Sequence, residues 1–448
     1  MIFFRNKILV ASIISGVIKG VSMLTIIALM ILIGRYGGPN ALGAYSLGIT
    51  VLTIITLVSL LGLPTLMMRK VGSFFHHKFL DVDKIRHGYI TALAITVGIN
   101  AVIAIVLFFT ADFLSIHLFN SELLVGVIKA VSVALLPIAL ITLHSNLIQG
   151  VHQPNFALTM QALCTPLFAL AILVMFLSFG GESEQLASLV MNYYAVGAWL
   201  VFFISFFYWL TIAKGVLNSF SIQHVLKGGV RALLKQANPF LLAGIGIAVL
   251  NMTDVLMLGF FSTIEQTGLY SAASRLAAGL TLVLFSVNNV IAPKLASSFA
   301  TGDMEAFSTY VRNATVLAFI PTLILVIVIG LFSSELLSLF GENFQQAQWI
   351  FIVLLAGNLI NALAGPVGWV LNMANCEKDF QGIILKAAIL NVFLNFVLIS
   401  YYGALGAAFA TMISTAAWNI HSAIVAYKRL GVCTVVGLNF LMKRGRNE

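Results

Sequence analysis

Residues 34–46 read GRYGGPNALGAYS, and residues 259–271 read GFFSTIEQTGLYS. Each stretch begins with a glycine that is followed nine residues later by a glycine-x-tyrosine-serine motif, so the two copies lie 225 residues apart. The same offset pairs Arg69 with Lys294. A run of matches at one offset indicates an internal duplication, in which each half of the chain builds a similar unit.

The composition is that of an integral membrane protein. Of the 448 residues, 60% are hydrophobic and only 9% are charged, which leaves too little polar surface for a soluble domain of this length. Apolar stretches of about 20 residues recur, and this is the length that crosses roughly 30 Å of hydrocarbon as a helix. We therefore expect an all-α polytopic membrane protein with twelve transmembrane helices, at approximately 8–33, 43–66, 88–111, 123–148, 157–179, 187–212, 239–261, 268–292, 314–333, 345–371, 383–401 and 405–426.

The distribution of Lys and Arg predicts the orientation. With the N-terminus in the cytoplasm, 19 of the 24 basic residues fall on the cytoplasmic side, Arg35 falls outside and four lie within spans. This is the bias that the positive-inside rule requires. Both termini are therefore expected to be cytoplasmic, and the formal charge of +9 reflects topology and contact with anionic lipids rather than nucleic-acid binding.

The longest polar stretch divides the chain into two halves of six spans. We expect an N-terminal six-helix bundle at 1–213, a cytoplasmic linker at 214–237, a C-terminal six-helix bundle at 238–430 and a cytoplasmic tail at 431–448. Because each half has an even number of spans, both repeats enter the membrane from the same side. Parallel repeats of this kind are found in alternating-access transporters.

Several short motifs resemble one known family. The loop at 34–46, the sequence LFGENF at 339–344 and the sequence YGALGAA at 402–408 are similar to those of polysaccharide exporters in the multidrug/oligosaccharidyl-lipid/polysaccharide (MOP) superfamily, most of all Wzx-type flippases of O-antigen repeat units. The resemblance implies a MATE-like fold and transport of undecaprenyl-diphosphate-linked oligosaccharide to the periplasmic leaflet of the bacterial inner membrane. It also implies membrane lipids and other polysaccharide-assembly proteins as partners.

Five ionisable side chains fall within the predicted spans. Four are basic, Lys19, Lys129, Arg275 and Lys386, and one is acidic, Asp254. A charge at mid-membrane costs about 3 kcal/mol on insertion scales, so such residues usually face a cavity or a partner. The excess of positive charge favours an anionic substrate.

Lys19 is the deepest of these charges. It lies near the middle of the first span, on a stripe with Ser12, Ser15, Gly16 and Ser22. Such a stripe either packs against a neighbouring helix or lines a water-filled cavity. The cavity reading makes Lys19 a substrate-binding residue.

Arg275 and Asp254 lie at similar depth in adjacent antiparallel spans. They form an ion pair in one interpretation. In the other, Arg275 binds phosphate or an acidic sugar, since its planar guanidinium suits bidentate contact, and Asp254 exchanges a proton or cation during the cycle. The sequence leaves both interpretations open.

The other polar residues within spans are ambiguous. Lys129 is close enough to the periplasmic surface to reach it, but is also a third candidate for substrate binding, and Lys386 is expected to be an interfacial anchor. Four asparagines either bind sugar or join helices by hydrogen bonds. They are Asn358, Asn361, Asn391 and Asn395.

No motif for catalysis, cofactor binding or metal binding occurs. The sequence contains no HExxH, Walker or GxSxG pattern, and its three cysteines lack metal-ligand spacing. We therefore expect a protein that is not an enzyme and uses no cofactor or nucleic acid. Three rival functions remain: a cation-coupled multidrug exporter of the same superfamily, a peptidoglycan-precursor flippase, for which fourteen helices are expected, and a non-transporting scaffold of glycan assembly.

Overall fold

A computed structural model describes most of the chain. It covers the backbone of residues 2–76, 79–181, 183, 185–214, 216 and 229–435, and the side chains of these positions except 2–13, 76, 79, 84, 229, 243, 247 and 289. Most of the predicted linker and the predicted tail beyond residue 435 lie outside these ranges. By contacts the chain forms two compact units, Met1–Ala248 and Val249–Glu448.

The first unit is helical apart from one small hairpin. Its apolar runs form long helices because backbone groups in lipid must bond within their own segment. Two-residue strands pair antiparallel between α2 and α3, with Phe75 opposite Leu80. The elements are α1 (Ile2–Ser59), α2 (Leu63–Ser73), β1 (Phe75–His76), β2 (Phe79–Leu80), α3 (Val82–Phe113), η1 (Leu114–Leu118), α4 (Leu123–Gly150), α5 (Pro154–Leu158), η2 (Thr159–Cys164), α6 (Thr165–Ser178), α7 (Leu186–Ile212) and the start of α9 (Gly229–Phe261).

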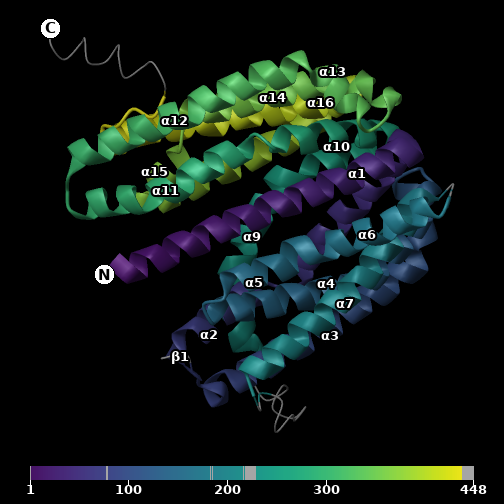
Figure 1. The fold of residues 1–448 in the computed structure, drawn as a ribbon, viewed down its shortest axis with the longest axis horizontal. Helices are drawn as coiled ribbons and strands as arrows, with labels where there is room; N and C mark the ends of the chain where they lie inside the picture. Colours follow the sequence, from purple (N-terminus) through teal and green to yellow (C-terminus); the bar gives the residue numbers. More distant parts are fainter. Residues whose placement is uncertain are drawn as a thin grey trace. The chain divides into compact units, whose positions relative to one another are not determined.

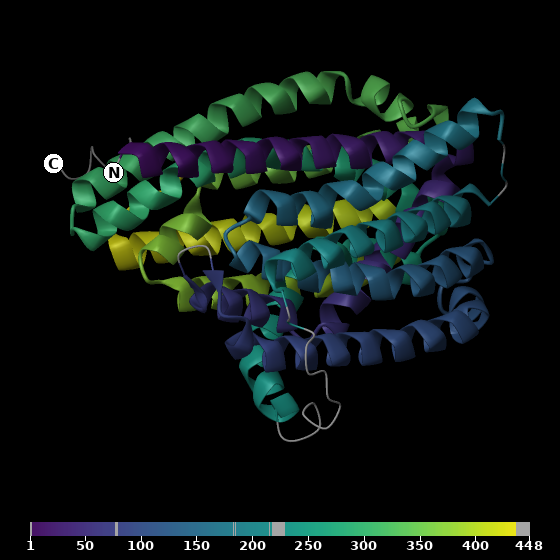
Figure 2. The same ribbon diagram turned by 60° about the horizontal axis from the view of Figure 1, so that its bottom comes forward.

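Helix α4 lies at the centre of the first unit. It contacts α1, α2, α3 and α7, and most of its side chains are buried. Two views of the ribbon agree that α3, α4 and α7 lie side by side (Figures 1 and 2). At the end of the unit that holds α2, buried side chains of α2, α3, α4, α7 and α9 form a single apolar cluster, which includes Met67, Tyr89, Leu147, Trp209 and Ala237.

The second unit is built from the end of α9 and the helices that follow. Helix α14 packs against α16, α12 and α10. The elements are α10 (Ile264–Ala278), α11 (Thr281–Ala300), α12 (Met304–Leu331), α13 (Ser333–Ser338), η3 (Glu342–Ala347), α14 (Gln348–Ala364), α15 (Val367–Met373) and α16 (Glu377–Leu430).

The two longest helices are each interrupted at a glycine. Helix α1 has non-helical backbone at Gly38 (φ 71°, ψ −175°), and α16 has non-helical backbone at Gly403 (φ 55°, ψ −132°). Glycine adopts positive φ without the steric penalty that a Cβ imposes. Beyond the second interruption, a Cβ at Gly406 would overlap the carbonyl oxygen of Leu398, so the absence of a side chain lets the two segments of α16 approach closely. Both interruptions fall where the sequence predicts loops between spans.

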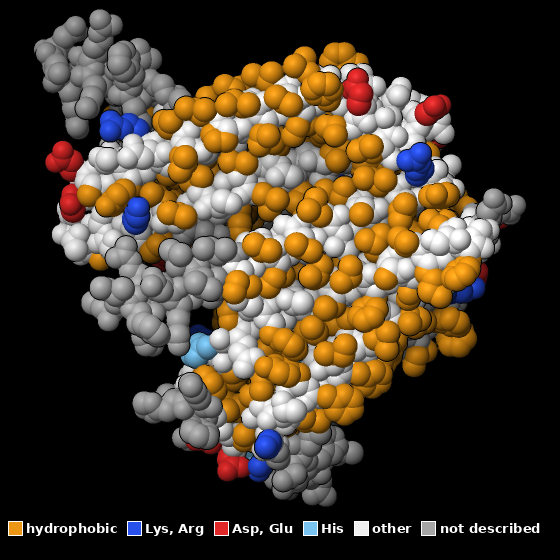
Figure 3. Space-filling model, viewed as in Figure 1, with side chains coloured by type: hydrophobic (Ala, Val, Ile, Leu, Met, Phe, Trp, Pro, Cys, Tyr) orange, Lys and Arg blue, Asp and Glu red, His pale blue; other side chains and the backbone are white. Residues whose placement is uncertain are grey.

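The chain is an all-α, multi-pass membrane protein, as the sequence predicts. Within the described residues nine helices are long and apolar enough to cross a membrane, and a further pair within α9, bent by 53°, also qualifies. On the face shown in Figure 3, hydrophobic side chains predominate and charged side chains are few. The count of twelve spans and the boundaries of the two bundles stay predictions.

Candidate functional site

Asp254 lies at the centre of a buried polar cluster in the second unit. Its exposed fraction is 5%. The hydroxyls of Tyr270 and Thr411 each donate a hydrogen bond to Oδ2 at 2.6 Å. The Oδ1 atom accepts a hydrogen bond from Asn395 Nδ2 at 2.6 Å and a longer one from Asn391 Nδ2 at 3.5 Å. We call these five residues the Asp254 cluster.

The interruption at Gly403 allows α16 to supply three members of this cluster. Asn391 and Asn395 precede the interruption and Thr411 follows it, so the two segments of α16 reach the same carboxylate. The side chain of Gln266, in the first turn of α10, accepts a hydrogen bond from the backbone nitrogen of Ala404 at 3.1 Å. Helix α10 therefore stabilises the interruption and also carries Tyr270.

The donors around Asp254 are those that an ionised carboxylate needs. All four are neutral, and an ionised carboxylate has only acceptor oxygens. Within the described part of the chain the buried Asn395 Oδ1 has no hydrogen-bond partner. Rotation of that amide would turn its oxygen toward Asp254. Asn395 and Asp254 can therefore either share a hydrogen bond or, with the amide rotated, present their side-chain oxygens together to a small cation.

Two members of the cluster could not be found from the pattern alone. Tyr270 belongs to the repeated glycine-x-tyrosine-serine motif, which is a signal for structural importance but does not identify its partner. Thr411 has no sequence signal that distinguishes it from other threonines within spans. At the repeat offset, the buried Leu29 corresponds to Asp254 and Tyr45 corresponds to Tyr270, so the carboxylate belongs to the second half alone.

Arg275 lies beside a short turn between two helices. Helix α10 ends at Ala278 and α11 begins at Thr281, but Gly279 and Leu280 keep right-handed helical backbone, and Ile264–Ala300 together form one candidate span that covers the span expected at 268–292. Arg275 is half-buried in the last turn of α10. In the same turn, Ala277 has a carbonyl that accepts a hydrogen bond from Asn358 Nδ2 at 3.2 Å. The backbone nitrogen of Leu280 also donates to the Ala277 carbonyl, at 3.1 Å, so Asn358 adds a contact between α14 and α10 at this turn.

The stripe around Lys19 combines helix packing with open space. Ser15 donates a hydrogen bond to Asn155 Oδ1 at 2.5 Å, so this part of the stripe packs against α5. By contrast, no described atom lies within 4 Å of a Cβ built at Gly16 or Gly20. Lys19 itself is exposed. Packing against a neighbouring helix therefore accounts for Ser15, and a water-filled cavity at Lys19 stays a prediction.

Ser22 satisfies a carbonyl that a proline releases. Pro166 has no N–H, so the carbonyl of Ala162, four residues before it, lacks the usual helical donor. The hydroxyl of Ser22 donates to that carbonyl at 2.7 Å. The backbone here forms the π-helical turn η2. This contact holds α1 against the irregular part of the fifth predicted span, one turn from Lys19.

We expect Ser22→Ala to destabilise the protein by about 1–2 kcal/mol, because it removes the hydroxyl that donates to a part-buried carbonyl. The measurement is the midpoint of unfolding of the purified protein in detergent. Ser178→Ala is the matched control, since the Ser178 hydroxyl donates only within its own helix, to the exposed end of α6. Equal midpoints for the two variants would contradict the role given to Ser22.

Lys129 and Lys386 differ in their surroundings. Lys129 pairs with Asp112 of α3, with 3.2 Å between Nζ and Oδ2, and these side chains are 37% and 61% exposed. Lys386 is exposed on α16. The partner of Lys129 neutralises much of its charge, and an anion would have to compete with Asp112.

The asparagines within spans join helices. Asn358 contacts α10, and Asn391 and Asn395 contact Asp254. Asn361 Oδ1 accepts a hydrogen bond from Asn419 Nδ2 at 3.1 Å, which links α14 to α16. Interhelical hydrogen bonding, one of the two interpretations of the sequence, thus accounts for all four.

Comparison with known proteins places the chain in a family. A family model described as a polysaccharide biosynthesis protein matches residues 4–299. The probable low-salt glycan biosynthesis flippase Agl15 of Haloferax volcanii is 25% identical over 244 residues, which are 51% of this chain and 51% of that protein. The match therefore spans about half the length of that relative.

Solved structures share the fold at low sequence identity. The lipid II flippase MurJ, in an inward closed conformation, aligns with a TM-score of 0.73 and 16% identity, covering 92% of this chain and 87% of that one. An inward-facing multidrug resistance MATE family transporter of the MOP superfamily aligns with a TM-score of 0.71 and 15% identity, covering 92% and 95%. The chain shares the fold of these two structures, and because the family model matches more than half of its residues, it belongs to the polysaccharide biosynthesis protein family.

Proposed function

We propose that this protein is a flippase that moves undecaprenyl-diphosphate-linked oligosaccharide, an O-antigen or related repeat unit, from the cytoplasmic to the periplasmic leaflet of the bacterial inner membrane. The observation that carries the proposal is the charge within the spans of a polysaccharide biosynthesis protein: four bases and one acid. A diphosphate headgroup is anionic and loses water on entering the membrane. Fixed positive side chains would replace that water.

Lys19 and Arg275 are the proposed headgroup ligands, with Lys129 in a lesser role because it is already paired with Asp112. Each of the two comes from a different half of the chain. Lys19 is exposed near two glycines at which a built Cβ would meet no described atom within 4 Å, and Arg275 is half-buried in the last turn of α10. The cycle is one of alternating access, in which the polyprenyl tail stays in lipid while the headgroup crosses. Both termini would be cytoplasmic.

Asp254 is the proposed coupling site, where a proton or small cation binds and leaves during each cycle. Binding of a cation at the carboxylate would require the hydroxyls of Tyr270 and Thr411 to turn their hydrogens away. It would also favour the orientation of Asn395 that presents Oδ1. Because the cluster joins α9, α10 and both segments of α16, the ion would change contacts among all of them.

One relative in sequence and one neighbour in fold support this proposal. Agl15 is a probable low-salt glycan biosynthesis flippase and MurJ is a lipid II flippase, so a relative in sequence and a neighbour in fold are both described as flippases. A multidrug exporter is the second candidate, since a MATE transporter shares the fold and the Asp254 cluster suits cation coupling. Cationic drugs, however, favour an acidic cavity, whereas the charged residues within these spans are mostly basic.

We expect deletion of the gene to stop display of the surface polysaccharide and to leave its lipid-linked oligosaccharide on the cytoplasmic leaflet. The measurement is extraction of lipid-linked sugars with a leaflet-selective label, in the deletion strain and in a strain with the gene restored. Normal surface polysaccharide together with raised sensitivity to cationic drugs would support the exporter instead. Failure of the purified protein to move labelled lipid-linked sugar in vesicles under any ion gradient would support a scaffold.

A further inference from the structure

Two adjoining pockets open beside the first turns of α9 in the first unit. One has a volume of about 660 Å³ and is lined by Leu61, Val230, Arg231, Leu234, Lys235, Asn238 and Leu241. The second, of about 380 Å³, is lined by Leu66, Arg69, Lys70, Ser73 and Gln236. Consecutive residues of α9, Lys235 and Gln236, line one pocket each. Neither pocket contains any of the residues assigned above to the substrate or the coupling ion.

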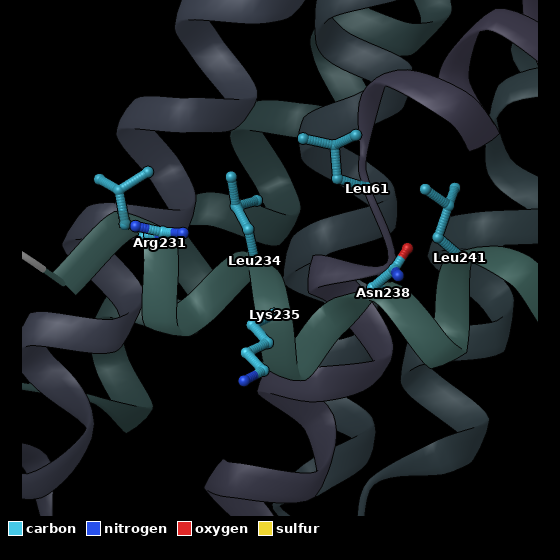
Figure 4. Close-up of a pocket in the computed structure, with 7 residues that line it drawn as sticks. Leu61, Arg231, Leu234, Lys235, Asn238 and Leu241 are labelled. Atoms are coloured by element: carbon cyan, nitrogen blue, oxygen red, sulfur yellow. The ribbon is translucent and has the colours of Figure 1, made fainter.

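The pockets are held in place by tight packing between α9 and the turn before α2. Leu233 and Ala237 of α9 are buried in the apolar cluster of the first unit. A Cβ at Gly62 would overlap the carbonyl oxygen of Ala237 and lie 2.7 Å from the nitrogen of Leu241, so the two backbones nearly touch. The residue before it, Leu61, has φ 51°, a conformation that is unfavourable for a leucine. That conformation lets Leu61 line the larger pocket opposite α9 (Figure 4).

The lining is apolar within and basic at the edge. Leu61, Leu234 and Leu241 supply an apolar wall in the larger pocket, while Arg231 and Lys235 are exposed on the same helix (Figure 4). The smaller pocket adds two further bases, which are Arg69 and Lys70. Among the described lining residues of both pockets none is acidic. All four bases belong to the set that the positive-inside rule assigns to the cytoplasmic side.

We propose that these pockets bind an anionic phospholipid of the cytoplasmic leaflet. The apolar wall suits the start of an acyl chain, and the basic side chains suit headgroup phosphate. Basic pockets between helices at the cytoplasmic surface are recognised sites for lipids with anionic headgroups. Two neighbouring pockets with two bases each match a headgroup that carries two phosphates, so cardiolipin is the best-fitting probe.

A bulk phospholipid is a better occupant than the polyprenyl-diphosphate carrier, although both carry phosphate. Occupancy depends on concentration relative to the dissociation constant, and structural phospholipids greatly outnumber a biosynthetic carrier in the leaflet. Each pocket also has exposed basic side chains, Arg231 and Lys235 in the larger and Arg69 in the smaller, and the positive-inside rule assigns them to the cytoplasmic side, where a resident headgroup would sit. The bound lipid would hold α9 against α2 at the start of the helix that carries Asp254.

The test is native mass spectrometry of the full-length protein released from micelles that contain equal amounts of phosphatidylcholine and cardiolipin. Wild-type protein is expected to retain one cardiolipin in preference to phosphatidylcholine. The double variant Arg231→Gln/Lys235→Gln should lower that retention about 25-fold, since each base near an anionic lipid contributes roughly fivefold. The control Arg312→Gln/Lys378→Gln removes two exposed bases from the second unit and should retain cardiolipin as wild type does.

Two further arms complete the design. Thermal midpoints in phosphatidylcholine alone report folding, and Arg69→Gln/Lys70→Gln replaces the first double variant if that one unfolds. Undecaprenyl diphosphate at equal concentration is expected to leave the bound cardiolipin in place, and its displacement of cardiolipin would overturn the assignment to a phospholipid. Equal retention by all variants, or an equal loss in the control, would overturn the site itself. Because no arm measures transport, these outcomes are independent of the proposed flippase activity.

Discussion

Replacement of Lys19 or Arg275 by glutamine is expected to reduce export of the lipid-linked sugar by at least tenfold while the amount of protein in the membrane is retained. A charge-assisted hydrogen bond contributes about 1.5–3 kcal/mol, and every 1.4 kcal/mol is a factor of ten. Glutamine keeps a hydrogen-bond donor and most of the side-chain length but removes the charge. The measurement is the initial rate of headgroup translocation in vesicles, with immunoblotting of the protein in cells.

Three comparisons sharpen that experiment. Lys386→Gln removes an exposed base assigned to the membrane interface and should change the rate less than twofold. Lys129→Gln should have an intermediate or small effect, because Asp112 already pairs with that ammonium. Lys19→Arg should restore much of the activity lost in Lys19→Gln if charge alone is required. Normal export in both neutral variants would remove Lys19 and Arg275 from the substrate pathway.

Asp254→Asn is expected to abolish the response of transport to an ion gradient, with a loss in gradient-driven rate of tenfold or more. The substitution removes the charge that would hold a proton or cation in the proposed site. Asparagine keeps the size of the side chain, and the hydroxyls of Tyr270 and Thr411 can rotate to accept hydrogen bonds from its Nδ2. The folded structure should therefore persist, which a thermal midpoint close to that of wild type would verify.

The control for this variant is Asp112→Asn. It also removes one carboxylate, but from a side chain that is 61% exposed and paired with Lys129. Surface ion pairs contribute at most about 1 kcal/mol, so transport should still follow the gradient. Residual downhill transport in Asp254→Asn would show that the substrate site is intact. Gradient-driven transport at the wild-type rate in Asp254→Asn would exclude Asp254 as the coupling residue.

The polar residues within spans show which features of the site the sequence predicts and which it does not. The regular spacing of Asn391 and Asn395 correctly predicts that they share one helix face. Their common partner, Asp254, lies 137 and 141 residues away, and no periodicity connects them. Thr411 joins them only because the chain reverses direction at Gly403. The sequence therefore identified most of the polar side chains but not the cluster that they form.

The turn near Arg275 illustrates the opposite limit. Residues 268–292 are continuously apolar enough to predict one span, and one candidate span, Ile264–Ala300, covers them, but the pattern did not predict the turn at Gly279 and Leu280. Beside this turn the carbonyl of Ala277 accepts hydrogen bonds from the backbone of Leu280 and from Asn358, which lies 81 residues away. A distant donor also serves Ala162, whose carbonyl loses its usual helical donor at Pro166 and accepts from Ser22. Irregular backbone within a membrane is tolerated only where such donors are available.

The amino-acid sequence by itself determined the membrane location, the helical class and the internal repeat, since hydrophobic run length and self-similarity are properties of the chain alone. It also predicted which charges fall within spans. Tertiary structure alone decided what two of those charges contact: four neutral donors surround Asp254, and Asp112 lies beside Lys129. The physical reason is that a buried polar group must find its partner in space, and packing between helices, rather than spacing along one helix, selects that partner.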